Sequence, residues 1–191
     1  MFQGYHGSTL DIVIDFTHNE MVKNIASEEA LEIKHLLKGY NPFNFFRACI
    51  LWKNLVTHGA RWDFKKKIKF NITNSNWIYD RELGIYYNFD IWSNIHYGFL
   101  GKYVGFNEWI LLSFAGLAQF TIGTTPKGYW KRRSKLPGKF FLAALDSTSD
   151  QNAIRLGFQL LDDYGTKLTK KNFLETIQKS YTSIYTKSKN E

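Results

Sequence analysis

Signals that begin and end helices recur along this chain, and they constrain it to a mainly helical fold. Asn41-Pro42 is an N-cap residue followed by proline at the first helical position, where the missing N–H of proline is tolerated. Gly59 is placed to end that helix at about His58, because glycine readily adopts the left-handed conformation that follows a helix. Asp90 opens another helix, expected to run to about Val104. Segments this short are stable only when they pack against one another.

Apolar periodicity and cap residues predict four more helical segments. They are residues 18–38 with a break and new cap near Ser27, residues 108–121 after Asn107, a segment from Ser149 or Asp150 to Gly165, and a last segment after Thr169. Two regions are predicted to be extended instead: an N-terminal strand or arm over residues 1–16, and a small antiparallel β unit within residues 62–89. The tail, residues 187–191, is expected to fray.

The length of 191 residues fits a single domain spanning 1–191, large enough to bury a core without a disulfide or a metal. The one cysteine, Cys49, lies in an apolar run and is interpreted as a buried thiol. The predicted fold class is therefore mainly α (α+β), a compact helical domain with one small antiparallel β unit, loosely lysozyme-like in plan. No His-x-x-x-His, Cys-x-x-Cys or P-loop motif is present, which disfavours a zincin, a zinc ribbon or an NTPase. We expect no cofactor and assign no metal ligands, while carboxylates and a histidine suffice for hydrolysis with or without a metal.

The chain carries a net charge of +8, which favours contact with an anionic polymer such as nucleic acid or a cell-wall glycan. Its most basic segment, residues 127–135, interleaves Lys and Arg with Tyr129 and Trp130. Bases and sugars both stack on such rings, so the segment suits either polymer, and a solvated loop is the plain alternative. No apolar stretch is long enough to span a membrane, and the first residues lack a secretory signal pattern. We therefore expect release through a dedicated secretion apparatus or as cargo.

The stretch from Tyr86 to Gly101 reads YYNFDIWSNIHYGFLG and is similar to the central motif of the bacterial toxin 44 family (polymorphic toxin type 44). Weaker elements of that family follow the same order, with the resemblance covering about residues 21–165. They are Trp62 to Lys65, Gly105 to Glu108, Ala115 to Gln119 and Asp146 to Ile154. Phe64 stands where the family has histidine, and Ser147 and Thr148 stand where it has aspartate and proline.

The resemblance implies a toxin delivered into a competing bacterium. We expect the periplasm rather than the cytoplasm, because a helical plan with a small β unit and many aromatic residues suits a groove for glycans. It also implies a cognate immunity protein and a secretion-apparatus component or carrier as partners. It leaves the reaction open between hydrolysis of the cell envelope, meaning peptidoglycan or its lipid-linked precursor, and ribonuclease activity. We favour the envelope hydrolase. A pore former or non-enzymatic binder is a third alternative, disfavoured by the lack of an amphipathic membrane segment.

Within the motif, Asp90 is either a helix cap or a functional carboxylate, and His96 is either a core residue or a general acid–base group. The candidate catalytic residues are His96, Asp90, Asp63, Asp146 and Asp150. The candidate substrate-binding residues are Trp62, Trp92, Asn94, Tyr97, Tyr129, Trp130, Arg132 and Arg133. Glycines recur at helical spacing after Asn94, which predicts close packing of another helix or of a substrate.

Overall fold

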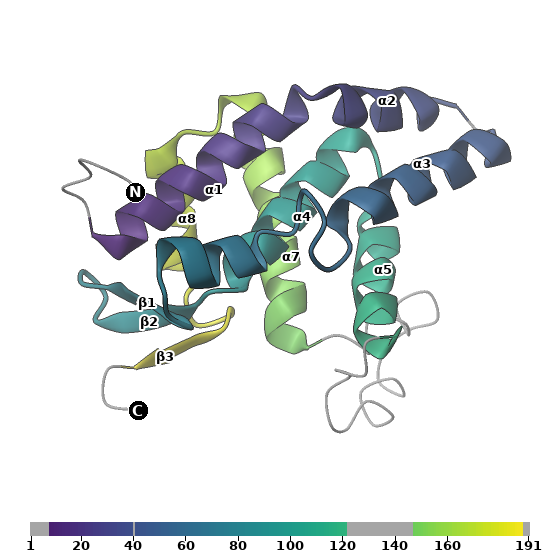
Figure 1. Cartoon of the computed structure of the whole chain (residues 1–191). Coiled ribbons are helices and arrows are strands. Elements are labelled where there is room, and N and C mark those ends of the chain that lie inside the picture. The colour runs from purple at the N-terminus through teal and green to yellow at the C-terminus, as the bar shows by residue number, and fades with distance from the viewer. Residues whose placement is uncertain (1–7, 40, 122–146, 189–191) are drawn as a thin grey trace.

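The computed structural model describes residues 8–39, 41–121 and 147–188, with only the backbone described for 118–121. The elements are α1 (Thr9–Ile25), α2 (Glu28–Leu36), α3 (Pro42–Val56), η1 (Lys67–Ile72), β1 (Trp77–Asp80), β2 (Ile85–Asn88), α4 (Ile91–Val104), α5 (Glu108–Thr121), α7 (Thr148–Tyr164), η3 (Gly165–Lys167), α8 (Lys170–Lys179) and β3 (Thr186–Ser188). Helices surround a central α4, and the small sheet lies at one end (Figure 1). The predicted mainly α class with a small antiparallel β unit is confirmed.

Most helices begin at the predicted caps. The side chain of Asn41 accepts hydrogen bonds from the backbone N–H groups of Phe43 and Asn44, and Ser27 and Thr169 cap α2 and α8 in the same way. The third helix ends at Val56, slightly before the expected position, and Gly59 follows with a φ of 80°. The cap of α7 is Ser147, so the expectation of Ser149 or Asp150 was late by two or three residues.

The N-terminal segment is a helix, and the prediction of an extended arm over residues 1–16 is wrong from residue 9 onward. Ser8 and Asp11 form a capping box, in which each side chain accepts a hydrogen bond from the backbone N–H of the other. Leu10, Val13 and Ile14 are buried from there on, with helical rather than alternating spacing. Reading the run as alternating failed because short apolar runs fit both periods, and the capping box decides between them.

The predicted β unit is present, but it occupies less of residues 62–89 than expected. Residues 67–72 form the π-helical η1 instead of a strand. The first two strands pair as an antiparallel hairpin with Tyr79 opposite Tyr86, and β3 pairs antiparallel with β2, placing Lys187 opposite Tyr86. Lys187 and Ser188 are therefore part of the sheet and not of a frayed tail; residues 189–191 lie outside the described residues.

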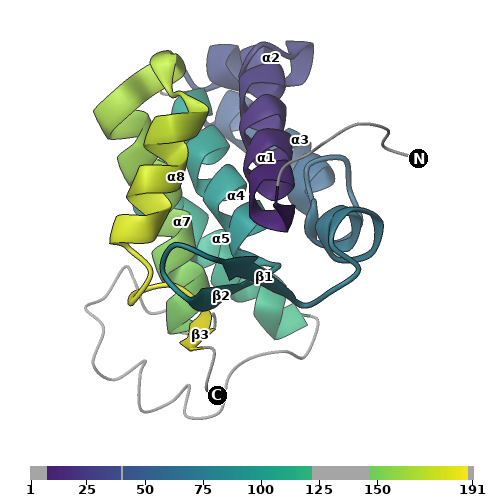
Figure 2. The same cartoon turned by 90° about the vertical axis from the view of Figure 1, so that its left-hand side faces the viewer.

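Glycine explains how closely α4 and α7 approach each other. A Cβ added at Gly98 would lie 2.0 Å from the carbonyl oxygen of Ile154, and one added at Gly157 would lie 2.2 Å from that of Ile95. The two backbones are therefore in direct contact, which confirms close helix packing as the reason for glycine in the middle of α4. Viewed from the side, α4 lies between α1 and the pair α7 and α8 (Figure 2).

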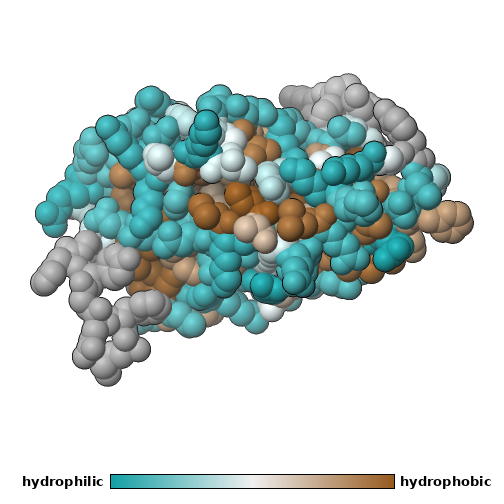
Figure 3. Space-filling view, turned by 90° about the horizontal axis from the view of Figure 1, so that it is seen from above, coloured by the Kyte–Doolittle hydropathy of each residue, from teal (hydrophilic) through white to brown (hydrophobic). Residues whose placement is uncertain are grey.

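The surface is mostly hydrophilic when the molecule is seen from above, with apolar side chains over the middle and at the end formed by α3 (Figure 3). Exposed hydrophobic residues of α1, α2 and α3 include Val22, Leu31 and Phe43. Among the described residues, no helix is both long and apolar enough to cross a membrane.

Candidate functional site

Asp90 lies at the junction between β2 and α4, in the position of a helix N-cap. Its backbone is already helical (φ −84°, ψ −18°), and its side chain makes no capping hydrogen bond. The backbone N–H of Asp90 donates to Oδ1 of Asn88 at 3.2 Å. Within the described part of the chain, Oδ1 of Asp90 is buried without a hydrogen-bond partner. The interpretation of Asp90 as a simple cap is therefore wrong, and its carboxyl group is available for another role.

Asp150 approaches the same place from the first turn of α7. Its Oδ1 accepts a hydrogen bond of 2.9 Å from Nδ2 of Asn94, one turn after Asp90 on α4. The side chain is nearly buried, with 9% of the residue exposed. Because α4 and α7 pack backbone to backbone, Asp150 is held where its charge acts on Asp90.

These surroundings raise the pKa of Asp90 from 3.8 to about 6. Burial is the largest cause, the negative charge of Asp150 adds to it, and the positive charge of Lys65 partly opposes both. A carboxyl group with such a pKa carries its proton for a useful fraction of the time near neutral pH. The pair therefore combines a potential proton donor, Asp90, with a second carboxylate, Asp150, as general acid–base chemistry requires.

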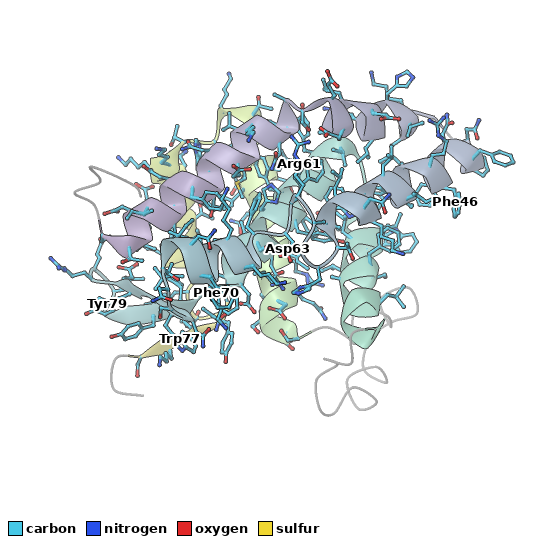
Figure 4. All side chains as sticks on the ribbon, in the orientation of Figure 1. Phe46, Arg61, Asp63, Phe70, Trp77 and Tyr79 are labelled. Carbon is cyan, nitrogen blue, oxygen red and sulfur yellow. The ribbon has the colours of Figure 1, made fainter. Side chains whose placement is uncertain are left out.

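Asp63 reaches the same turn of α4 from the loop between α3 and η1. It accepts hydrogen bonds from the backbone N–H groups of Gly59 (2.9 Å) and Lys65 (3.2 Å), and from Oγ of Ser93 (3.3 Å). Ser93 lies three residues after Asp90, so this contact fixes the loop against the start of α4. Asp63 is near the centre of the face seen in Figure 4. Three of the predicted carboxylates, Asp63, Asp90 and Asp150, thus gather around the first turn of α4.

Two side chains at this site were not among the predicted residues. The exposed imidazole of His58 places Nδ1 3.6 Å from Oδ2 of Asp63, and Lys65 is close enough to influence Asp90 electrostatically. Lys65 belongs to the Trp-Asp-x-Lys element noted in the sequence, so that element was a usable signal. Nothing local marks His58, because its contact with Asp63 depends on the path of the loop after α3.

His96 lies in the core and not in this cluster. Its side chain is fully buried, and Nδ2 of Asn24 donates a hydrogen bond of 3.1 Å to Nε2. The ring of Phe64 packs against it with centroids 4.5 Å apart. Burial lowers the pKa of His96 from 6.5 to about 3, so the ring is neutral. This position does not support the predicted exchange of protons with a substrate; it indicates that His96 positions α4 against α1.

The predicted aromatic substrate contacts are also structural. Trp62 and Trp92 are buried, and Trp92 packs edge-on against Tyr87 and Phe173. The hydroxyl of Tyr97 donates to the carbonyl oxygen of Leu111 at 2.9 Å. Of the predicted substrate-binding residues on this part of the chain, only Asn94 faces the carboxylate cluster. Asp146, Tyr129, Trp130, Arg132 and Arg133 lie outside the described residues.

In the part of the chain that the structure describes, no three His, Cys, Asp or Glu side chains are grouped so that they could bind a metal ion. The family model described as bacterial toxin 44 matches residues 51–163, more than half of the chain and the whole carboxylate cluster. This chain belongs to the bacterial toxin 44 family. No curated protein and no solved structure matches it. As a bacterial toxin domain, it carries its distinctive polar cluster inside the region that defines the family.

Proposed function

We propose that this toxin hydrolyses the bacterial cell envelope, acting on peptidoglycan or its lipid-linked precursor through the carboxyl groups of Asp90 and Asp150. One observation carries the proposal: the buried, unpartnered oxygen of Asp90 beside a second aspartate on the adjoining helix. Hydrolysis of a glycosidic bond uses such a pair, one carboxyl group giving a proton to the leaving oxygen while the other acts as a base or nucleophile.

The surroundings of the two carboxyl groups support different roles for them. Asp90, with its raised pKa, is the proton donor to the oxygen of the departing sugar. Asp150 is the partner carboxyl group; Asn94 donates a hydrogen bond to it, and it lies in the first turn of α7, at the positive end of the helix dipole. Its negative charge would stabilise the positive charge that develops on the sugar ring. Asp150 would then either activate a water molecule as a base or attack the sugar itself as a nucleophile.

The ribonuclease alternative depends on His96 as the acid or base and on the basic segment around Arg132 and Arg133. The burial of His96 removes the support for the first part, and the second lies outside the described residues. The envelope is therefore the better target. The proposal keeps the partners expected above, a cognate immunity protein and a secretion-apparatus component or carrier, and it keeps delivery to the periplasm of the target bacterium.

The deciding experiment combines location with product analysis. The protein is produced in a sensitive bacterium with and without a periplasmic signal, and purified protein is incubated with isolated sacculi and with the lipid-linked precursor. Toxicity only in the periplasm, together with release of glycan fragments or precursor cleavage, is the expected result, and it should disappear in Asp90→Asn. The control is Asp163→Asn, an exposed carboxylate at the far end of α7. Toxicity confined to the cytoplasm, with RNA degradation, would refute the proposal.

A further inference from the structure

The outer face of the sheet carries a group of aromatic rings with a lysine among them. In β1, Ile78 and Asp80 are buried while Trp77 and Tyr79 alternate with them on the other face. Tyr79 pairs with Tyr86, with ring centroids 4.9 Å apart. Lys187 of β3 places Nζ 4.5 Å from the ring centroid of Trp77 and 5.5 Å from that of Tyr86, while Tyr185 packs edge-on against Trp77 at 5.3 Å. We call Trp77, Tyr79, Tyr86, Tyr185 and Lys187 the aromatic track.

The track is accessible, and it continues into an open pocket. Tyr185 is 45% exposed, and Phe70, beside the track, is 59% exposed. The pocket is lined by Lys69, Phe70 and residues 74–76, which lead directly into Trp77. Phe70 and Trp77 lie together on one face of the molecule, with Tyr79 farther along the sheet (Figure 4). Trp77, Tyr79 and Tyr86 are half-buried, so the track offers partly exposed rings beside the exposed rings of Tyr185 and Phe70. Such a group of aromatic side chains on one face is typical of a binding surface.

The track and its pocket adjoin the candidate site. The backbone N–H of Phe89 donates to the carbonyl oxygen of Asn76, in the pocket wall, at 3.0 Å. Lys69 places Nζ 5.2 Å from the ring centroid of Phe89, and Asp90 is the next residue. The pocket wall is therefore joined through Phe89 to the start of α4, where Asp90 lies.

From this arrangement we infer that the aromatic track binds a carboxylate-bearing glycan strand and presents it to Asp90 and Asp150. The inference rests on the proposed function and extends it from the reacting bond to the neighbouring sugars. Aromatic rings offer flat apolar surfaces to the C–H faces of pyranose rings, and Lys187 and Lys69 offer positive charges to the carboxylates that such a strand carries.

Single-stranded nucleic acid also stacks on exposed rings, but the far end of the surface disfavours it. A strand of RNA that followed the track would bring its phosphates toward the carboxyl groups of Asp63, Asp90 and Asp150. Among the described residues, Lys65 offers a positive charge beside Asp90. Negatively charged phosphates and carboxylates that come into contact repel each other strongly when both are partly removed from water. The sugar rings of a glycan strand meet the same cluster with neutral hydroxyl groups, while the carboxylates of the strand are bound at Lys187 and Lys69.

The test measures binding in the Asp90→Asn background, so that the probe is not cleaved. The probes are soluble, uncross-linked glycan strands carrying peptide stems and, separately, a single-stranded oligouridylate. Trp77→Ala should weaken glycan binding about tenfold or more, whereas Trp77→Phe, which keeps an aromatic ring, should stay within about threefold. The matched control is Phe46→Ala, an aromatic residue that is 64% exposed on α3, at the opposite end of the molecule.

Lys187→Gln keeps every ring and serves as a second test if Trp77→Ala does not fold. It should weaken glycan binding at low salt and have little effect at high salt. Equal glycan affinity in Asp90→Asn with and without these changes overturns the inference, and so does tighter, Trp77-dependent binding of the oligouridylate. Failure of the proposed function gives a different pattern: the unmodified protein would then leave the envelope substrate uncleaved, or Asp90→Asn would still cleave it, whatever the track binds.

Discussion

Asp90 and His96 lie six residues apart at the start and in the middle of the same helix, yet their surroundings are opposite. Burial disfavours the charge on both, which raises the pKa of Asp90 and lowers that of His96. Asp90 also faces a second carboxylate, whereas His96 is enclosed by Phe64 and bonded to Asn24. Each group has one buried atom without a hydrogen-bond partner among the described residues, Oδ1 of Asp90 and Nδ1 of His96. The difference teaches that burial alone does not make a reactive group; the group must also meet a complementary partner that a substrate can reach.

The largest expected effect is on chemistry at the start of α4. Asp90→Asn should lower hydrolysis by roughly 10²–10⁴-fold, the contribution typical of general acid–base catalysis. The folded state should not suffer, because the amide removes a charge that burial and Asp150 disfavour. Product release from sacculi and a thermal melt measure the two properties. Full activity with an unchanged melting temperature would show that Asp90 is not the acid.

A change in the middle of the helix should have the opposite outcome. His96→Leu removes the acceptor of the Asn24 hydrogen bond and leaves that buried amide unsatisfied, which should cost about 1–3 kcal/mol of stability. Activity per folded molecule should stay within about threefold, because the ring does not reach the carboxylates. Denaturant unfolding measures the stability of His96→Leu, and an assay at low temperature, where the variant stays folded, measures its specific activity. If His96→Leu loses activity but keeps normal stability, His96 takes part in catalysis and the contrast with Asp90 is wrong.

The two groups should also give opposite dependences of stability on pH. For Asp90 the folded-state pKa is raised, so its favourable contribution is complete below pH 3.8 and is lost as the pH rises through about 6. For His96 the folded-state pKa is lowered, so its contribution is present above pH 6.5 and is lost as the pH falls toward 3. The plots of melting temperature against pH from 4 to 7 should therefore have different slopes for Asp90→Asn and His96→Leu. Parallel plots would contradict the opposite pKa shifts of the two groups.

The smallest expected effect concerns the contact between the loop and the helix. Ser93→Ala removes the 3.3 Å hydrogen bond to Asp63 and the 3.2 Å bond from the backbone N–H of Phe64, which should lower stability by about 1 kcal/mol. Activity should fall only severalfold, because Asp63 keeps two backbone donors. Kinetics of Ser93→Ala and Ser93→Thr compare the loss of the hydroxyl with its retention, and equal behaviour of the two variants would show that the bond is unimportant.

Much of the fold could be predicted because caps act locally. Asn41, Ser27 and Thr169 each bind backbone groups within three residues, so the sequence alone reveals them. The helix Thr9–Ile25 was predicted only from about residue 18, because the apolar run before that position fits two periods. The aromatic track was also missed, since the position of Lys187 depends on a strand from the end of the chain pairing with β2.

The site was predictable only in part. Asp63, Asp90 and Asp150 were identified as candidates, but their meeting depends on long-range contacts through Ser93 and Asn94. A core position was one of two alternatives that the sequence left open for His96, and the structure decides for it, because α4 is buried on nearly all sides.

The glycine contact between α4 and α7 has a mechanical consequence for the two carboxyl groups. With Gly98 and Gly157 in backbone contact, neither helix can slide or rotate without a clash, so the pair acts as a single stiff frame. Asp90 lies at the start of α4 and Asp150 in the first turn of α7. Gly98 lies about 12 Å along α4 from Asp90, at a rise of about 1.5 Å per residue. A methyl group added at Gly98 or Gly157 would push α4 and α7 apart, and this displacement would change the distance between the carboxyl groups of Asp90 and Asp150. The spacing on which the reaction depends is thus set by two residues that lack side chains and touch no substrate.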